Sequence, residues 1–386
     1  MTKLKVLLLS TDNSGTIAKC AANLYEAFQT TSNVEVKSAI MYKYSNGESI
    51  LSDSIFFIDR LSNEKANTSI INKIKWLRDI KKEFNPDIII STQNAASILS
   101  VLSFGTEKKV GIFHAPKSQR KTSGFLYYFL TLLTYYLIFP FLSKCFCVSK
   151  EVAADLQKIF SIRKSNIQVV YNIHNIDRIK RLAVDSLLVS EEKIFSKPVA
   201  LYCGRIDDNK APIRVIDAFR YVRNEEVQLV LIGPDPYNLW DNIEARIPFD
   251  LKHRIHYLGP KSNPYSYMAK SKVVVSCSYS EGLPGVLIES LALGVPVVTT
   301  NSSSGNWEIL SCSNDYNENL VDNYQAVDGI ITSNLSNHNP SAYDSDVENL
   351  GKAINEMLTS PRIVKFNFAS LISSSEIISK FLKVVR

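Results

Sequence analysis

Two carboxylates, Glu281 and Glu289, lie eight residues apart around a Gly/Pro turn. The segment predicts a strand, the turn Gly282-Leu283-Pro284-Gly285, a short helix from about 285 to 293, and a second strand. An ionised Glu289 among Val, Leu and Ile is costly to bury unless something hydrogen-bonds it, and ligand hydroxyl groups would do so. The alternative is that Glu289 lies on a solvent-facing stripe of the helix.

The turn also offers the N-terminus of a helix. The first N–H groups of a helix have no partner within it, and the helix dipole is positive at this end. Gly282 and Gly285 leave the backbone open to close approach by an anion or a polar ligand. A molecule with sugars at both ends and phosphate between them suits this combination.

A pair of cations follows another predicted strand, 199–203. Arg205 and Lys210 lie five residues apart in the loop Gly204-Arg205-Ile206-Asp207-Asp208-Asn209-Lys210. Two cations near a strand end suit a diphosphate. A solvated loop is the alternative interpretation of this pair.

Short apolar runs alternate with longer amphipathic segments along the whole chain, which predicts βα units and parallel sheets. A polar stretch at about 179–197 reads as an interdomain link. We therefore expect an α/β protein with two Rossmann-like, doubly wound domains facing a cleft, and ligands beyond the carboxyl ends of the strands. The expected strands are 4–9, 34–40, 87–91, 109–113, 144–148 and 167–170, then 199–203, 228–232, 254–258, 272–277, 296–300 and 329–332.

The two glutamates, the Gly-hydrophobic-Pro turn and the Gly-x-Pro-Val-Val continuation at 294–298 resemble the E-x7-E signature of retaining GT-B glycosyltransferases of family 4 (glycosyl transferases group 1). The resemblance covers most of the chain and is strongest over 199–310. It implies an acceptor-binding domain at 1–185, a nucleotide-sugar-binding domain at 190–362, and a C-terminal helix within 363–386 that packs back on the first domain. It also implies an enzyme of the hexosyltransferase type.

The resemblance implies a role for each residue of the turn and the cation loop. Arg205 and Lys210 would contact the donor diphosphate, matching the family's G-R-(x)n-K element. Glu289 would bind the donor ribose, and Glu281 the hydroxyls of the donor sugar. Backbone N–H groups around the turn would cover sugar and phosphate; its residues are Gly282, Leu283, Pro284 and Gly285.

Three residues of the first half also match the family. His114 follows the strand ending at Phe113 and would touch the donor sugar, so it joins Glu281 at the reacting centre; a structural or exposed histidine is the alternative. Gly15 matches a glycine-rich loop for acceptor and donor phosphate, although one glycine stands where two are usual. Asn172 matches an Asn common in the family, and a turn role explains it equally well.

No metal site is expected. Asp344-Ser345-Asp346 has the D-x-D form that binds a metal-nucleotide in the other glycosyltransferase fold, but it lies in a polar stretch (334–347) that reads as a solvated surface loop, as does 312–327. The six cysteines are scattered, which indicates buried free thiols in a reducing compartment. Donor charge then falls to Arg205, Lys210 and the helix dipole, with no cofactor besides the nucleotide-sugar co-substrate.

Composition is that of a globular protein, with 45% hydrophobic and 21% charged residues. The net charge of +6 does not call for nucleic acid, but it suits anionic nucleotides or an anionic membrane surface. No signal peptide is indicated. The uncharged segment Phe125–Leu142 could span a membrane, form a buried helix or dock at an interface; its four tyrosines favour docking.

The expected function is transfer of a sugar, with retention, from a nucleotide-diphosphate donor to a lipid-linked saccharide acceptor in bacterial surface polysaccharide (O-antigen or capsule) synthesis. The expected place is the cytoplasmic face of the bacterial inner membrane, as a peripheral protein. One alternative is a catalytically silent GT-B module that binds polysaccharide or partner subunits. The others, of the same fold, are a nucleotide-sugar epimerase and a glucan synthase.

Overall fold

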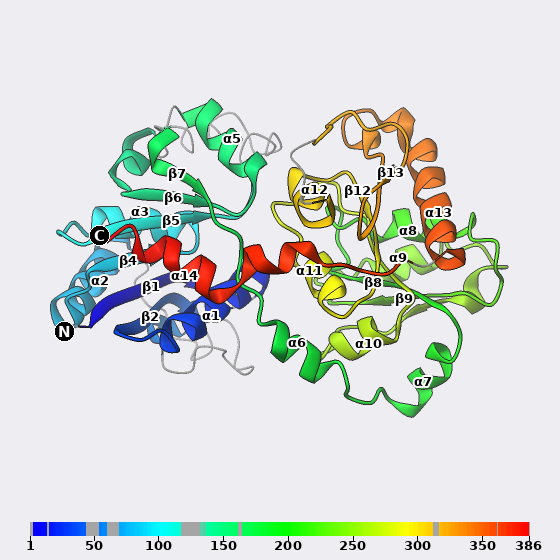
Figure 1. Cartoon of the computed structure of the whole chain (residues 1–386), viewed down its shortest axis with the longest axis horizontal. Coiled ribbons are helices and arrows are strands. Elements are labelled where there is room, and N and C mark those ends of the chain that lie inside the picture. Colours follow the sequence, from blue (N-terminus) through cyan, green and yellow to red (C-terminus); the bar gives the residue numbers. More distant parts are fainter. Residues whose placement is uncertain are drawn as a thin grey trace. The chain divides into compact units, whose positions relative to one another are not determined.

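The computed structural model describes residues 3–13, 15–43, 54–59, 69–116, 133, 136–160, 164–311, 316–360 and 362–385. The chain forms two compact units, Met1–His174 with Ser370–Arg386, and Asn175–Ala369. In the described residues each unit is built on one seven-stranded, mainly parallel sheet with helices packed on it (Figure 1). The predicted α/β class with two doubly wound sheets is confirmed.

The sheet of the first unit is parallel throughout, in the order β3-β2-β1-β4-β5-β6-β7. Six of these strands were predicted from their apolar runs. The edge strand β3 was not, because it is a five-residue run that pairs only with β2. The strands are β1 (Leu4–Asp12), β2 (Val34–Lys43), β3 (Ile55–Asp59), β4 (Ile88–Ser91), β5 (Lys108–Phe113), β6 (Lys144–Cys147) and β7 (Ile167–Val169).

Helices cover this sheet, and the last helix of the chain returns to it. The Phe381 ring lies 5.8 Å from the Phe28 ring of α1 and 4.7 Å from the Phe146 ring of β6, both edge-on. Apolar burial therefore holds α14 (red in Figure 1) in the first unit. The helices are α1 (Gly15–Gln29), α2 (Ile70–Phe84), α3 (Asn94–Leu102), η2 (Phe139–Phe141), α5 (Lys150–Phe160), η3 (Lys164–Asn166) and α14 (Ser374–Leu382). The short helix η7 (Asn367–Ile372) includes the point between Ala369 and Ser370 where the chain passes from the second unit to the first.

The sheet of the second unit has the order β10-β9-β8-β11-β12-β14-β13, with only β13 antiparallel. The six predicted strands form within about two residues of the expected bounds. The two-residue β13 is too short to give a sequence signal. The strands are β8 (Val199–Cys203), β9 (Gln228–Ile232), β10 (Ile255–Tyr257), β11 (Val273–Ser276), β12 (Val297–Thr300), β13 (Tyr324–Gln325) and β14 (Gly329–Thr332).

The helices of the second unit pack on its sheet and on one another. Helix α13 packs on β11, β12 and β14 and against α8 (Figure 1). The helices are α6 (Ile176–Leu182), α7 (Val189–Phe195), α8 (Pro212–Phe219), α9 (Trp240–Glu244), η4 (Lys252–Arg254), α10 (Tyr265–Lys270), α11 (Gly285–Ala292), α12 (Ser304–Ser311), η5 (Leu335–Asn337), η6 (Pro340–Ala342) and α13 (Tyr343–Thr359).

The stretch expected as an interdomain link at 179–197 instead carries α6 and α7 of the second unit. Helix α6 packs against α10 and α11. In α7 the buried Glu191 accepts hydrogen bonds from Lys261 Nζ (2.6 Å) and Tyr267 Oη (2.5 Å). Glu191 is thus paired within the second unit. The units divide between His174 and Asn175.

The expectation of a solvated loop over 334–347 is wrong at its C-terminal end. Helix α13 begins at Tyr343, so Asp344-Ser345-Asp346 forms its first turn, where carboxylates suit the helix dipole. Asp344 and Ser345 are exposed, but Asp346 is fully buried. The burial of Asp346 cannot be predicted from the local sequence, because Arg214, the residue that compensates its charge, lies 132 residues earlier in the chain.

The segment Phe125–Leu142 falls largely outside the described residues, which include only Leu133 and 136–142 of it. In this part Phe139 and Leu142 are buried. Four large apolar side chains are exposed: Leu133, Tyr136, Leu137 and Phe141. Over the described ranges of the chain, no helix has both the length and the apolar character needed to cross a bilayer.

Candidate active site

The cation loop after β8 is fixed against the loop after β9. The Gly204 N–H donates to Ile232 O (3.0 Å), and the Ile206 N–H donates to Pro234 O (2.9 Å). Gly233 has φ +144°, and a Cβ there would lie 1.9 Å from Gly204 O. Only glycine fits this approach, so the two strand ends are held together by their backbones.

The side chain of Tyr202 fixes the backbone of the cation loop at Arg205. Its hydroxyl donates to Arg205 O at 2.7 Å. Burial raises the pKa of Tyr202 well above its ordinary value, so the hydroxyl remains protonated and remains a donor.

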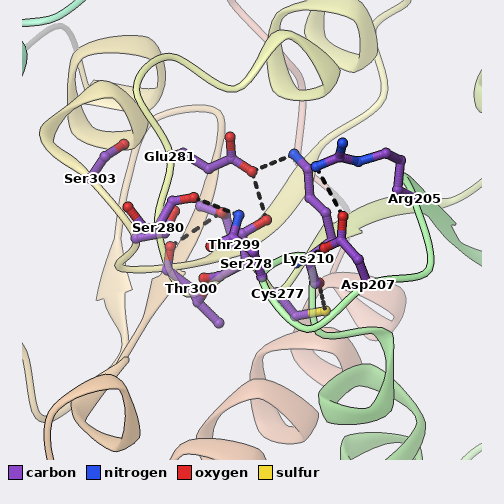
Figure 2. Close-up of polar contacts among 12 residues, drawn as sticks. Arg205, Asp207, Lys210, Cys277, Ser278, Ser280, Glu281, Thr299, Thr300 and Ser303 are labelled. Carbon is purple, nitrogen blue, oxygen red and sulfur yellow. Dashed lines mark hydrogen bonds and ion pairs between the residues drawn. The ribbon is translucent and has the colours of Figure 1, made fainter. Parts of the chain in front are cut away.

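Asp207 contacts the side chain of Arg205 and the backbone of Lys210. The Arg205 guanidinium lies 2.9 Å from Asp207 Oδ2, and its side chain is 57% exposed. The Lys210 N–H donates to Asp207 Oδ1 at 2.7 Å. Ala211 then takes a left-handed conformation (φ 46°), which ends the loop and starts α8. Asp207 therefore shapes the loop that presents the two cations (Figure 2).

The loop after β11 brings Glu281 to Lys210. The Lys210 ammonium contacts Glu281 Oε1, and the Ser278 hydroxyl donates to the same oxygen at 2.7 Å (Figure 2). Further bonds tie the two loops: Asn209 Nδ2 donates to Ser280 O (3.0 Å), and the Tyr279 N–H donates to Asn209 O (2.8 Å). The structure thus joins a loop with two cations to a loop with a carboxylate.

A buried thiol adds a tie between the same loops. Cys277 Sγ donates to Ala211 O at 3.1 Å and to Lys210 O at 3.3 Å. Burial raises the pKa of Cys277 to about 12, so the thiol stays neutral and keeps its proton. Cys277 acts here as a small packing and hydrogen-bonding group.

The turn after Glu281 leads into α11 as predicted. Pro284 precedes the first helical residue, Gly285, and the turn lies against the start of α12. A Cβ on Gly305 of α12 would lie 2.5 Å from Gly282 O, so α12 approaches the turn as closely as backbone allows. The N-termini of α11 and α12 therefore meet at this turn.

Glu289 lies on the buried side of α11. It is 8% exposed, and Tyr265 Oη donates to its Oε1 at 3.4 Å. The solvent-facing alternative for Glu289 is wrong.

The residues expected in the first half lie in the first unit. His114 follows β5 and Asn172 follows β7, and both line one cavity of that unit together with Thr92, Tyr171 and Phe381 of α14. Gly15 begins α1 with φ +77°, a left-handed conformation that favours glycine. Among the described residues, Gly15 is not part of the cavity lining.

Both halves of the chain match known glycosyltransferase families. Residues 188–342 match the family described as Glycosyl transferases group 1, and residues 54–178 match the family described as Glycosyltransferase Family 4. The chain belongs to the group 1 glycosyltransferases.

This glycosyltransferase has named relatives. It is 24% identical over 296 residues to an uncharacterised glycosyltransferase of Methanocaldococcus jannaschii, covering 72% of each chain. It is 32% identical over 162 residues, 42% of each chain, to the N-acetylgalactosamine-N,N'-diacetylbacillosaminyl-diphospho-undecaprenol 4-alpha-N-acetylgalactosaminyltransferase of Campylobacter jejuni. A second alpha-1,4-N-acetyl-D-galactosaminyltransferase of that species, which acts on an undecaprenol-diphosphate-linked glycan, is 26% identical and covers 80% of this chain and 82% of its own. These relatives agree with the assignment of the glycosyltransferase as a hexosyltransferase.

Solved structures show the same GT-B fold. Anabaena HepE in complex with UDP and glucose has a TM-score of 0.68 at 15% identity, over 98% of this chain and 99% of that one. The glycosyltransferase WaaG, involved in lipopolysaccharide biosynthesis, has a TM-score of 0.64 at 14% identity, over 98% of each chain. At such identities the likeness concerns the fold alone, and it agrees with the two Rossmann-like units.

The cations and carboxylates of this glycosyltransferase can be recognised in its sequence, but the residues that hold them cannot. Asp207, Ser278 and Cys277 carry no motif of their own, and their partners become visible only in the folded loops. Among the described residues, no group of three or more His, Cys, Asp or Glu side chains could hold a metal ion.

Proposed function

We propose that the second unit binds a nucleotide-diphosphate sugar and that the enzyme transfers the sugar, with retention, to a lipid-linked saccharide acceptor. The observation that carries this proposal is the pair of tied loops, in which Lys210, Arg205 and Glu281 converge beside the N-terminus of α11. The UDP bound to Anabaena HepE supports a nucleotide donor. The undecaprenol-diphosphate-linked substrates in the names of the Campylobacter relatives support the acceptor class.

In this proposal the two cations hold the donor diphosphate. Arg205 is the more exposed cation, and Lys210 lies deeper, with its side chain 25% exposed. Both reach their carboxylates through flexible side chains, so each can turn to a phosphate oxygen while its loop stays fixed. The backbone N–H groups at the start of α11 add a positive dipole end.

The carboxylates hold the sugars at the two ends of the donor. Glu281 accepts bonds from the hydroxyls of the transferred sugar, while Lys210 and Ser278 keep its carboxylate oriented. Glu289, buried one turn further into α11, binds the ribose. The backbone of Gly282, Leu283 and Gly285 covers the sugar and phosphate. His114 touches the transferred sugar, and Gly15 and Asn172 belong to the acceptor and phosphate loop of the first unit.

Retention follows from attack on the face from which the diphosphate leaves. The bond between the sugar C1 and the donor phosphate oxygen breaks, and its electron pair stays with the diphosphate. The acceptor hydroxyl oxygen forms the new bond to C1, and its proton passes to the departing phosphate oxygen. The protein contributes positioning and stabilisation of the leaving charge, and needs no separate general base.

Donor charge is balanced without a divalent metal in this proposal, because Arg205 and Lys210 supply two cations from one loop. Transfer rates measured in EDTA should therefore equal those measured with added Mg²⁺ or Mn²⁺. A rate that collapses in EDTA and recovers with added metal contradicts this part.

The acceptor places the enzyme at a membrane surface. An undecaprenyl chain stays in the bilayer, so its saccharide is met at the headgroup level. The exposed Leu133, Tyr136, Leu137 and Phe141 of the first unit suit peripheral contact with such a surface. A role in bacterial O-antigen or capsule assembly fits this acceptor class.

A nucleotide-release assay tests the function. The purified enzyme is given a panel of nucleotide sugars, with and without a lipid extract containing undecaprenyl-diphosphate-linked saccharides. We expect release from one donor that depends on the extract, and loss of release in Glu281→Gln. Lys352→Ala, which removes a lysine 62% exposed on α13 and paired with Glu348, is the control and should keep full activity. Absence of nucleotide release with every donor and extract contradicts the proposal and favours a silent module.

A further inference from the structure

Arg214 is a fully buried cation directly behind the two loops. It lies in the first turn of α8, four residues after Lys210, and its side chain has no exposed surface. A charged group is this deeply buried only when its surroundings compensate the charge. Its partners show what this arginine is attached to.

The guanidinium of Arg214 contacts the segment 277–279, which leads to Glu281. Its Nη1 donates to Cys277 O at 3.3 Å, and its Cζ lies 4.7 Å from the centre of the Tyr279 ring. The same Nη1 donates to Asn334 Oδ1 at 2.7 Å. Asn334 in turn donates through Nδ2 to Tyr279 O at 2.9 Å. Arg214 and Asn334 therefore hold both ends of the stretch 277–279, two residues before Glu281.

Asp346 anchors this arrangement on α13. Its Oδ2 lies 3.3 Å from Arg214 Nη2 and accepts bonds from the Ser336 N–H (2.8 Å) and hydroxyl (2.6 Å). Its Oδ1 accepts a bond from the Leu335 N–H at 3.2 Å. The carboxylate is thus satisfied by the loop after β14 as well as by Arg214, and it fixes the guanidinium in one orientation.

A buried ion pair of this kind adds little stability compared with apolar residues of the same volume. Its distinctive property is directional: the rigid, planar guanidinium bonds carbonyl, amide and carboxylate groups at set angles. Through its backbone Arg214 is tied to the Lys210 loop, and through its side chain to the Glu281 loop. Arg214 thus joins both loops to a third element, α13.

We infer that Arg214, held by Asp346 and Asn334, is a positioning residue that sets the spacing between Lys210 and Glu281 for the donor. The inference rests on the proposed function, in which those two residues hold the nucleotide sugar. Arg214 itself is buried and touches no substrate. Its effect on the donor passes through Lys210 and Glu281.

The test compares Arg214→Met with a matched buried arginine of the same unit. Arg254 is also buried, lies 4.7 Å over the Phe219 ring at the C-terminal end of α8, and donates to Val227 O (3.0 Å) and Asn224 O (2.7 Å), none of which belongs to either donor loop. Thermal unfolding curves identify a temperature at which every variant is folded. At that temperature, calorimetric titration with the nucleotide sugar that is active in the nucleotide-release assay gives the donor Kd.

We expect Arg214→Met to raise the donor Kd about tenfold and Arg254→Met to leave it within twofold, even where both lower Tm. Asn334→Ala is the milder second variant, since it leaves the ion pair intact, and it should raise the donor Kd about threefold. In a Lys210→Ala background Arg214→Met should add less than twofold, because the pair of residues whose spacing it sets, Lys210 and Glu281, is then already broken.

Equal donor Kd values for the Arg214 and Arg254 variants overturn the inference. So does a full tenfold loss in the Lys210→Ala background. A wild-type enzyme that binds none of the nucleotide sugars overturns the proposed function itself and the inference with it, so the two failures are distinct.

Discussion

Ser278 offers the sharpest single-atom perturbation of the proposed donor site. Ser278 is 1% exposed, and its hydroxyl donates to Glu281 Oε1 at 2.7 Å. Ser278→Ala removes one oxygen and leaves the backbone, whose carbonyl accepts from Thr300 Oγ1 at 2.7 Å, unchanged. The substitution therefore tests how Glu281 is held without altering its charge.

A hydrogen bond to a charged group is worth about 1.5–3 kcal/mol. Lys210 remains as a partner of the same oxygen, so we take the lower end, about 1.5 kcal/mol. If that energy is lost from the bound donor, kcat/KM falls about tenfold. The assay is initial-rate nucleotide release over a range of donor concentrations.

Ser290→Ala is the control for loss of a buried serine. Ser290 is fully buried in α11 and donates to the neutral Val295 O at 2.9 Å. It should lose about 1 kcal/mol of unfolding free energy and keep kcat/KM within twofold. A Ser278→Ala enzyme with wild-type kcat/KM, measured beside this control, refutes the role of Ser278 in orienting Glu281.

Two further predictions concern stability and thiol chemistry. Burial raises the pKa of Glu191, but hydrogen bonds from Lys261 and Tyr267 outweigh it and leave that pKa below its ordinary value of 4.5. In urea unfolding Glu191→Gln should therefore cost about 2 kcal/mol at pH 7, and the difference should shrink as pH falls below 4.5 through the lowered folded pKa; a constant difference at all pH values contradicts the ion pair. Iodoacetamide at pH 8 should label the partly exposed Cys20 and Cys203 of the native protein, because burial keeps the other described thiols protonated. Those thiols are Cys145 and Cys277, each with a pKa raised to about 12, and Cys147, with a pKa raised further. Peptide mass spectrometry that finds them labelled in the native protein contradicts this prediction.

The sequence predicts the sheets well because apolar runs such as those of β8 and β11 record burial on both faces of a parallel sheet. These two strands are neighbours in the sheet, and the loops after them therefore meet at one edge. That adjacency explains how Lys210 and Glu281, 71 residues apart in the chain, come into contact.

The burial of residues whose partners are distant in the sequence was not predicted. Asp346 stands in a locally polar stretch and was expected to be solvated, but Arg214, 132 residues earlier, compensates its burial. Glu191 looked like part of a linker for the same reason, since Lys261 lies 70 residues away. In each case local composition describes the neighbours in the chain, while the free energy of burial depends on neighbours in space.

The claim that the two tied loops form the donor diphosphate site is tested most directly by calorimetric titration of nucleoside diphosphates into three proteins. These are the wild-type enzyme, Lys210→Ala, and the exposed-lysine control Lys352→Ala. We expect one nucleoside diphosphate to bind the wild type and the control with equal affinity and to bind Lys210→Ala at least tenfold more weakly. Equal affinity of all three proteins for that nucleotide would contradict the claim.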